Sequence, residues 1–147
     1  MNGSCELVTF RGGDLEYCID IRHVREIRSW TPATPIPGAP ADMIGVINLR
    51  GTVVPVMDLG MRLGRAKSDA SARHAIIVVE MGEQLHGLLV EGVSDIISAG
   101  EAMIHRVPDM SSADSQACVH GIVTLDDRLI SLLSLENVLP KQGLKAA

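Results

Sequence analysis

Short apolar runs separated by polar turns dominate the hydrophobic pattern of this chain. Residues 45–59 contain an apolar run, a polar turn, a second apolar run and a closing leucine, and residues 121–135 repeat that order at a constant offset of 76. Apolar runs of this length joined by a tight polar turn are typical of β-hairpins. The pattern therefore predicts two similar hairpins, with their tips near residues 48–52 and 126–128.

A second, weaker repeat lies upstream of each hairpin. Residues 19–27 match residues 88–96 at an offset of 69, and another strand and turn precede each of these segments. Both halves of the chain therefore follow one order of strand, turn, strand, loop and hairpin. The positions that matter below and that this alignment superposes are Val24 with Val93, Glu26 with Asp95, and Ile27 with Ile96.

The two repeats predict an all-β fold of two similar subdomains, about residues 5–65 and 74–139. The segment between them, residues 65–73, is small and polar, as a surface crossover should be. Four prolines in residues 31–40 exclude a central strand there. Helix is limited to short turns, one after Asp58 and one at the end of the second half.

Composition removes several functional classes. Hydrophobic residues make up 46% of the chain, which is enough apolar material for one compact domain. Charged residues make up 21%, and the net charge is −5. The acidic balance argues against a general nucleic-acid binder, and an aromatic content of 2% leaves too few rings for base stacking. No apolar stretch approaches the roughly 20 residues of a membrane-spanning helix, and the start of the chain lacks the pattern of a secretion signal.

The cysteines and histidines predict no chemistry. Cys5, Cys18 and Cys118 are odd in number and contain no close pair, which favours reduced thiols in a cytosolic protein. No two of the five histidines have the spacing of a structural zinc site. His120 lies near Cys118, but nothing supplies the third group or the oxyanion hole that a cysteine nucleophile needs. We therefore expect no metal, no cofactor and no catalytic residues.

Three segments carry a resemblance to a known family. Residues 17–27, 44–59 and 86–96 resemble the signature segments of CheW-type coupling proteins, and the similarity extends from about residue 6 to residue 139. Matches of this length and spacing are far more specific than a lone short motif. The chain departs from the family pattern at Cys18, Gly60 and Ser134, which bears on partner specificity rather than on the fold.

The resemblance implies a fold and a function. The fold is a single CheW-like domain over residues 1–147, made of two SH3-like five-stranded β-barrels with a hydrophobic groove where they meet. The function is that of a non-enzymatic adaptor, which binds the cytoplasmic hairpin of methyl-accepting chemoreceptors and the regulatory domain of the histidine kinase CheA. We expect it in the cytoplasm, recruited to membrane receptor arrays through these partners and not inserted in the membrane itself.

The expected receptor site is the groove. Val24, Ile27, Val93 and Ile96 occupy matching places in the two halves, so a symmetric groove would be lined by both pairs, and an apolar groove suits a helical rod. Residues of this alternating pattern are otherwise core residues. Including two glycines that the resemblance places nearby, the predicted set is Val24, Ile27, Gly45, Gly87, Val93 and Ile96.

Two charged residues form a second candidate site. The resemblance links Glu26 and Arg50 to signalling, and we predict that they form an ion pair within one subdomain, because an unpaired guanidinium in an apolar sequence is costly. The alternative is a solvated surface pair of at most about 1 kcal/mol. In the second half Asp95 replaces Glu26 but Asp126 replaces Arg50, so we expect no equivalent pair there.

The kinase-binding surface is predicted at the exposed apolar strand ends near Leu49 and Val53. Two other functions remain open at this point. The first is a CheW-like adaptor of a kinase pathway for pilus motility or development. The second is a β-barrel that binds a small ligand, for which the acids at strand positions alternate with apolar residues in the pattern of solvated faces rather than of a site.

Overall fold

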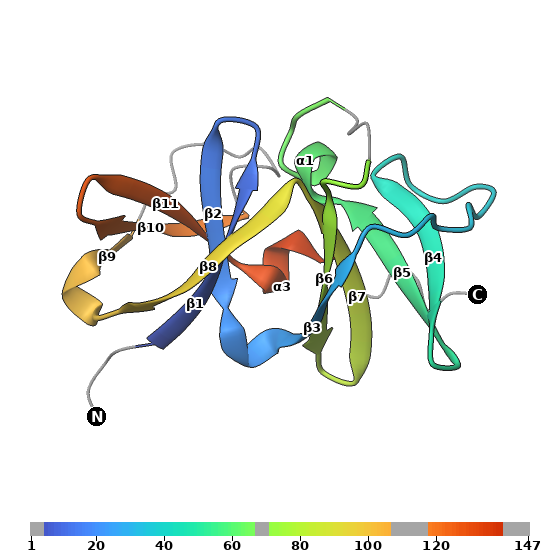
Figure 1. The fold of residues 1–147 in the computed structure, drawn as a ribbon, viewed down its shortest axis with the longest axis horizontal. Coiled ribbons are helices and arrows are strands. Elements are labelled where there is room, and N and C mark those ends of the chain that lie inside the picture. Colours follow the sequence, from blue (N-terminus) through green and yellow to red (C-terminus); the bar gives the residue numbers. More distant parts are fainter. Residues whose placement is uncertain (1–4, 67–70, 107–117, 140–147) are drawn as a thin grey trace.

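The computed structural model describes residues 5–66, 71–106 and 118–139, and within them the chain forms two β-sheets (Figure 1). Sheet A has the strand order β8-β1-β2-β11-β10-β9, and sheet B has the order β3-β6-β7-β5-β4. The strands are β1 (Cys5–Gly12), β2 (Leu15–Asp20), β3 (Val24–Ser29), β4 (Met43–Leu49), β5 (Thr52–Asp58), β6 (Ala75–Met81), β7 (Gln84–Val90), β8 (Gly92–Ala99), β9 (Ile104–Arg106), β10 (Val119–Leu125) and β11 (Arg128–Leu133).

Helix is short throughout the described residues. Two single turns of 3₁₀ helix, η1 (Ile21–His23) and η2 (Glu101–Met103), each follow a strand, and two short α-helices, α1 (Leu59–Arg62) and α3 (Leu135–Val138), each follow a hairpin. The N-cap of α1 is Asp58, whose side chain accepts from the backbone amide of Met61. The expected helical turns after Asp58 and at the end of the second half are both present.

Both predicted hairpins form, β4 with β5 and β10 with β11. Their tips contain Arg50 and Asp126, which are the non-glycine residues of positive φ in the described part of the chain, at 53° and 55°. These two positions are related by the 76-residue offset, so the two halves build their turns in the same unusual backbone conformation.

The sheets do not follow the two halves of the sequence, and the predicted subdomain ranges need correction. Sheet A joins β1 and β2 of the first half to β8–β11 of the second, and sheet B joins β3–β5 of the first half to β6 and β7 of the second. Each half thus exchanges its first hairpin with the other. Ranges of residues 5–65 and 74–139 describe the repeat, while each barrel draws strands from both.

Sheet A has six strands where five were expected. The extra strand, β9, pairs with β10 through His105 and Ile122, and the matching contact in sheet B is the isolated bridge between Thr34 and Val46. Prolines flank Thr34 at positions 32 and 35, and proline lacks the amide that a continuous ladder needs. The two sheets therefore differ in their outermost segment, which forms a short strand in sheet A and a single bridge in sheet B.

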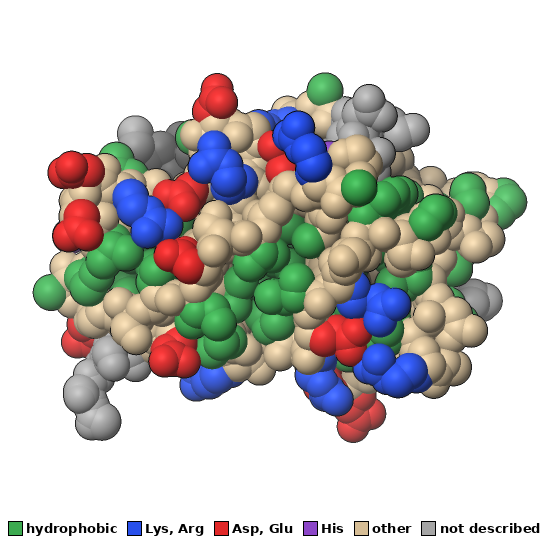
Figure 2. Space-filling view, viewed as in Figure 1, with side chains coloured by type: hydrophobic (Ala, Val, Ile, Leu, Met, Phe, Trp, Pro, Cys, Tyr) green, Lys and Arg blue, Asp and Glu red, His purple; other side chains and the backbone are tan. Residues whose placement is uncertain are grey.

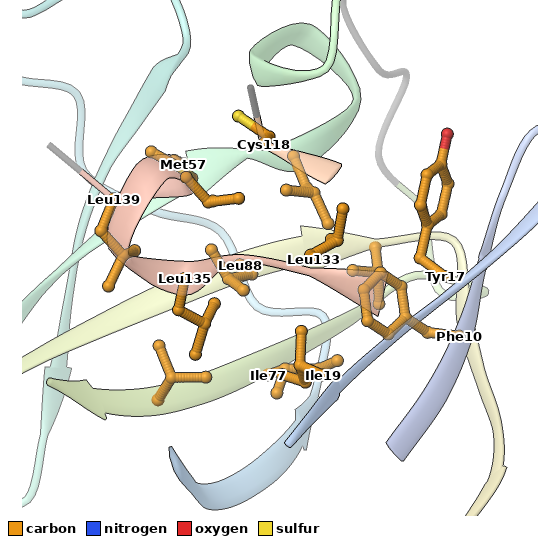
Figure 3. Close-up of a cluster of buried hydrophobic side chains, with 14 of the residues drawn as sticks. Phe10, Tyr17, Ile19, Met57, Ile77, Leu88, Cys118, Leu133, Leu135 and Leu139 are labelled. Carbon is orange, nitrogen blue, oxygen red and sulfur yellow. The ribbon is translucent and has the colours of Figure 1, made fainter. Parts of the chain in front are cut away.

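Three apolar clusters stabilise this arrangement. One fills sheet B around Val54, Val56 and Val78, and another fills sheet A around Leu7 and Ile130. The third and largest lies between the two sheets (Figure 3), and we call it the inter-sheet core; its buried members are Val8, Phe10, Tyr17, Ile19, Met57, Leu59, Ile77, Val79, Leu88, Val90, Cys118, Leu133, Leu135, Val138 and Leu139.

The two short helices also connect the sheets. Arg62 in α1 donates from Nε to the carbonyl of Val138 at 2.9 Å and from Nη2 to that of Asn137 at 2.7 Å. A cation at the last carbonyls of α3 supplies the partners that a helix end otherwise lacks. With the exchanged hairpins and the shared core, this contact makes the two sheets one packed unit.

Candidate partner-binding surface

Two edge strands face the inter-sheet core, β3 at the edge of sheet B and β8 at the edge of sheet A. Each contains a β-bulge at the same repeat position. In β3, Val24 pairs with Val79 and Glu26 with Val78, which leaves Arg25 as the extra residue. A bulge of this kind changes which residues of a strand share a face.

The bulge explains the spacing of three between Val24 and Ile27. In a regular strand, residues three apart point to opposite faces. Beyond the bulge, however, Ile27 pairs with Ile77, and both Val79 and Ile77 belong to the inter-sheet core. Val24 and Ile27 therefore lie on the same face of sheet B.

The same construction appears in β8. Val93 pairs with Phe10 and Ile96 with Val8, with Ser94 as the extra residue of the bulge. Phe10 and Val8 are again members of the inter-sheet core. The four aliphatic residues predicted from the repeat thus lie on two edge strands that border one core, and we call them the edge-strand patch.

The edge-strand patch is open to solvent in part. Val24 and Val93 are half-buried and pack against the inter-sheet core, whereas Ile27 and Ile96 are 44% and 56% exposed. Figure 2 shows hydrophobic side chains gathered on this face between β8 and β3, with charged side chains of both signs on either side. Contiguous apolar surface of this kind marks interaction sites more often than isolated exposed residues do.

The two glycines of the predicted set lie elsewhere. Gly45 pairs with Val56, and Val56 pairs with Gly87, so both flank one core residue inside sheet B. Both are buried. A Cβ on Gly87 would lie 3.0 Å from a methyl group of Ile76, and one on Gly45 would lie 2.3 Å from the carbonyl oxygen of Thr34. These surroundings favour a role in packing for both glycines, and their contact with a partner stays a prediction.

Glu26 and Arg50 form the ion pair that the sequence predicts. Nη2 of Arg50 donates to Oε1 of Glu26 at 2.6 Å, and Nη1 of Arg28 donates to Oε2 at 3.0 Å. Arg50 first, and then Arg28, lowers the pKa of the Glu26 carboxyl, so the carboxylate is ionised at neutral pH. The predicted pair lies within one barrel, as expected.

This pair joins opposite edges of one sheet. β3 and β4 are the two outer strands of sheet B, and Arg50 follows directly after β4. Four strand-to-strand steps of about 4.8 Å would separate these edges by about 19 Å in a flat sheet. Contact between the side chains shows that sheet B curls until its edges approach.

Contrary to expectation, the second half has an equivalent contact. Asp95, the counterpart of Glu26, lies 3.6 Å from Nη2 of Arg128. Arg128 also forms a two-point hydrogen bond with Glu16, at 3.1 Å from Nε and 2.8 Å from Nη2. The repeat alignment missed it because this arginine begins β11, two residues after Asp126, whereas Arg50 lies in the hairpin turn itself.

The two residues predicted to contact the kinase differ in exposure. Leu49 is 5% exposed and belongs to the core of sheet B, so its prediction as an exposed strand end is wrong. In β4, Ile47 and Leu49 alternate inward, which turns Asn48 outward. Val53 pairs with Asn48 and is 67% exposed, so it remains accessible to a partner.

Burial shifts the pKa values of one buried thiol and one buried imidazole. Burial raises the pKa of the Cys18 thiol to about 12, which leaves it protonated and unreactive. Burial also lowers the pKa of His86. Among the residues with described positions, no group of three or more His, Cys, Asp and Glu side chains is placed to hold a metal ion. In the same residues, no helix has the length and apolarity to cross a bilayer.

Known proteins resemble this chain over nearly its whole length. The family model described as a CheW-like domain matches residues 6–143. The chain belongs to the CheW-like family. It is 44% identical to the chemotaxis protein CheW of Rhizobium meliloti (strain 1021), over 99% of this chain and 94% of the relative. It is 46% identical to a probable chemotaxis protein CheW of Rhizobium etli over 99% of this chain and 94% of that relative.

A solved structure agrees with the fold. The crystal structure of the scaffolding protein TtCheW from Thermoanaerobacter tengcongensis superposes with a TM-score of 0.85, at 34% identity, over 95% of this chain and 94% of that one. The prediction of an all-β fold with two SH3-like subdomains is confirmed. Membership in the CheW-like family also confirms the predicted function of a chemotaxis coupling adaptor, and it favours chemotaxis over a pilus or developmental pathway.

Proposed function

We propose that this adaptor couples the cytoplasmic hairpin of methyl-accepting chemoreceptors to the regulatory domain of the histidine kinase CheA, and that it catalyses no reaction itself. The observation that supports the receptor contact is the edge-strand patch. Its four aliphatic side chains come from two sheets, border one core and retain exposed apolar surface. A helical rod is the partner that such a surface fits.

The kinase contact is proposed at the exposed end of sheet B that carries Val53, which lies on the far side of the β4–β5 hairpin from the buried Leu49. Separate surfaces allow both partners to be held at once. Each contact is expected to be modest, on the order of 600 to 800 Å² per side, because an array gains strength through repetition. Recruitment from the cytoplasm to membrane receptor arrays then follows from partner binding alone.

Charge placed in the edge-strand patch tests the receptor contact. We expect Val24→Asp and Val93→Asp to abolish binding of a receptor cytoplasmic fragment in isothermal titration calorimetry, because a carboxylate cannot be desolvated against an apolar helix face. Ile27→Asp and Ile96→Asp change side chains that are more exposed, so these variants should keep the fold of the parent chain. The same loss of binding is expected for them. Leu129→Asp, which places the same charge on an exposed aliphatic side chain outside the patch, is the matched control.

The kinase contact is measured on the same proteins. The patch variants should bind the CheA regulatory domain as the parent chain does, while Val53→Asp should weaken that binding and leave receptor binding unchanged. Normal receptor binding by both Ile27→Asp and Ile96→Asp would contradict the assignment of the patch. Turnover of any compound by the purified chain would contradict the absence of catalysis.

A further inference from the structure

We infer that Arg128 is a positioning residue of the receptor-binding surface, which holds the β8 edge in place through Asp95 as Arg50 holds the β3 edge through Glu26. The inference rests on the proposed function of the edge-strand patch. It adds to that proposal a second ion pair between distant strands of one barrel. This pair lies in the half of the chain where the repeat alignment indicates none.

Asp95 and Arg128 lie on strands of sheet A that are not neighbours. Arg128 begins β11 and Asp95 lies in β8, and the order β8-β1-β2-β11 separates the two strands by three steps. In a flat sheet these steps would amount to about 14 Å. The distance of 3.6 Å between Nη2 of Arg128 and Oδ1 of Asp95 therefore shows that the long Arg128 side chain reaches across sheet A to its β8 edge.

Arg128 is itself held in a fixed orientation. Its two-point contact with Glu16 on β2 uses the planar fork of the guanidinium, a geometry that gives direction as well as attraction. The side chains of Glu16 and Arg128 are 19% and 34% exposed, so solvent reaches them only in part. The bond from Arg128 lowers the pKa of Glu16, which keeps the carboxylate ionised and the contact intact at neutral pH.

Asp95 is fixed from the other side by Thr9. The hydroxyl of Thr9, which is fully buried, accepts from the backbone amide of Asp95 at 3.1 Å and donates to Asp95, whose carbonyl and carboxylate oxygens both lie within its reach. These contacts occur directly beside the bulge residue Ser94. Arg128 and Thr9 together therefore fix the point at which β8 changes face, between Val93 and Ile96 of the edge-strand patch.

The two halves reach this result by different residues. Glu26 on β3 also lies between two patch residues, Val24 and Ile27, directly after the bulge residue of its own strand. Its arginine comes from the hairpin turn, whereas Arg128 occupies the position that matches Thr52. Each edge of the patch thus carries an acid held by an arginine from the hairpin of its own barrel.

Neutral substitutions in the full-length chain test the inference. Arg128→Gln and Asp95→Asn should each weaken receptor-fragment binding by about 3- to 10-fold. The double variant should bind no more weakly than the weaker of the two single variants, because both substitutions break the same contact between Arg128 and Asp95. Arg128→Lys, which keeps the charge, should recover part of the lost affinity. Arg106→Gln, at an exposed arginine of sheet A, is the matched control.

Two parallel measurements separate positioning from stability and from the proposed function. Binding of the CheA regulatory domain should be unchanged in Arg128→Gln, whereas general loss of structure would weaken both partners equally and overturn the inference. Val93→Asp reports on the patch itself. If Val93→Asp loses receptor binding while Arg128→Gln and Asp95→Asn keep it, the inference is wrong and the proposed function stands; if Val93→Asp also binds normally, both fail.

Discussion

At the scale of single residues, Gly45 and Gly121 show how a close backbone contact restricts side-chain choice. The two positions are related by the repeat, and each follows a register shift in its hairpin. A Cβ on Gly121 would lie 2.7 Å from the carbonyl oxygen of His105, and one on Gly45 would lie 2.3 Å from that of Thr34. The segment that borders each hairpin therefore approaches it closely only because the side chain is absent.

We expect Gly45→Ala to lower the free energy of unfolding by about 1–3 kcal/mol, since backbone rather than a flexible side chain must move to admit the methyl group. Urea denaturation followed by circular dichroism measures this change. Gly100→Ala is the control, because a Cβ there meets no atom within 4 Å, and its effect should stay within about 0.5 kcal/mol. Equal stability of the two variants would show that Thr34 yields to the added group.

At the scale of elements, the bulges in β3 and β8 decide which side chains reach the surface between the sheets. In a regular strand of the same sequence, Val93 and Ile96 would be three steps apart and would face opposite ways. Each bulge therefore converts an ordinary edge strand into one that presents two aliphatic side chains to the same core. Edge bulges also discourage uncontrolled strand pairing.

Deleting Ser94 tests the role of the bulge directly. The deletion leaves Val93 and Ile96 two residues apart, so in the resulting regular strand both still face the inter-sheet core opposite Phe10 and Val8. Receptor-fragment affinity should therefore stay within about threefold of that of the parent chain, with a cooperative unfolding transition retained. Ser94→Ala keeps the bulge and should also bind as the parent does; a loss of affinity of about tenfold in the deletion variant alone would show that the bulge does more than bring Val93 and Ile96 to one face.

Local sequence pattern predicted the hairpins, the short helical turns and the matching aliphatic pairs, because each depends on residues close together in the chain. It did not predict that Leu49 faces inward, since an apolar residue at a strand end gives no sign of which face is buried until the register is known. Arg128 was missed for a related reason. The alignment compared position with position, whereas the contact with Asp95 depends on which face of a curled sheet the arginine occupies.

At the scale of the whole molecule, strand exchange makes the two halves inseparable. β1 and β2 find their outer partners in β8 and β11, while β6 and β7 find theirs in β3 and β5. A repeat in the sequence cannot indicate this, because hairpins that are alike pair equally well within a half or across halves. The result is that both edges of the patch depend on strands from the opposite half.

Fragments test this dependence. Residues 1–68 and 69–147, produced separately, each contain hairpins whose partner strands are missing, so we expect neither to show cooperative thermal unfolding, since two-stranded hairpins are marginal alone. Mixed in equal amounts, they should form a 1:1 complex by light scattering, with the sheet content of the intact chain. Receptor-fragment binding should return only in the mixture, because β3 comes from one fragment and β8 from the other. Independent cooperative folding of either fragment would instead mean that the strands can pair within one half, and that the exchange is not what holds the two barrels together.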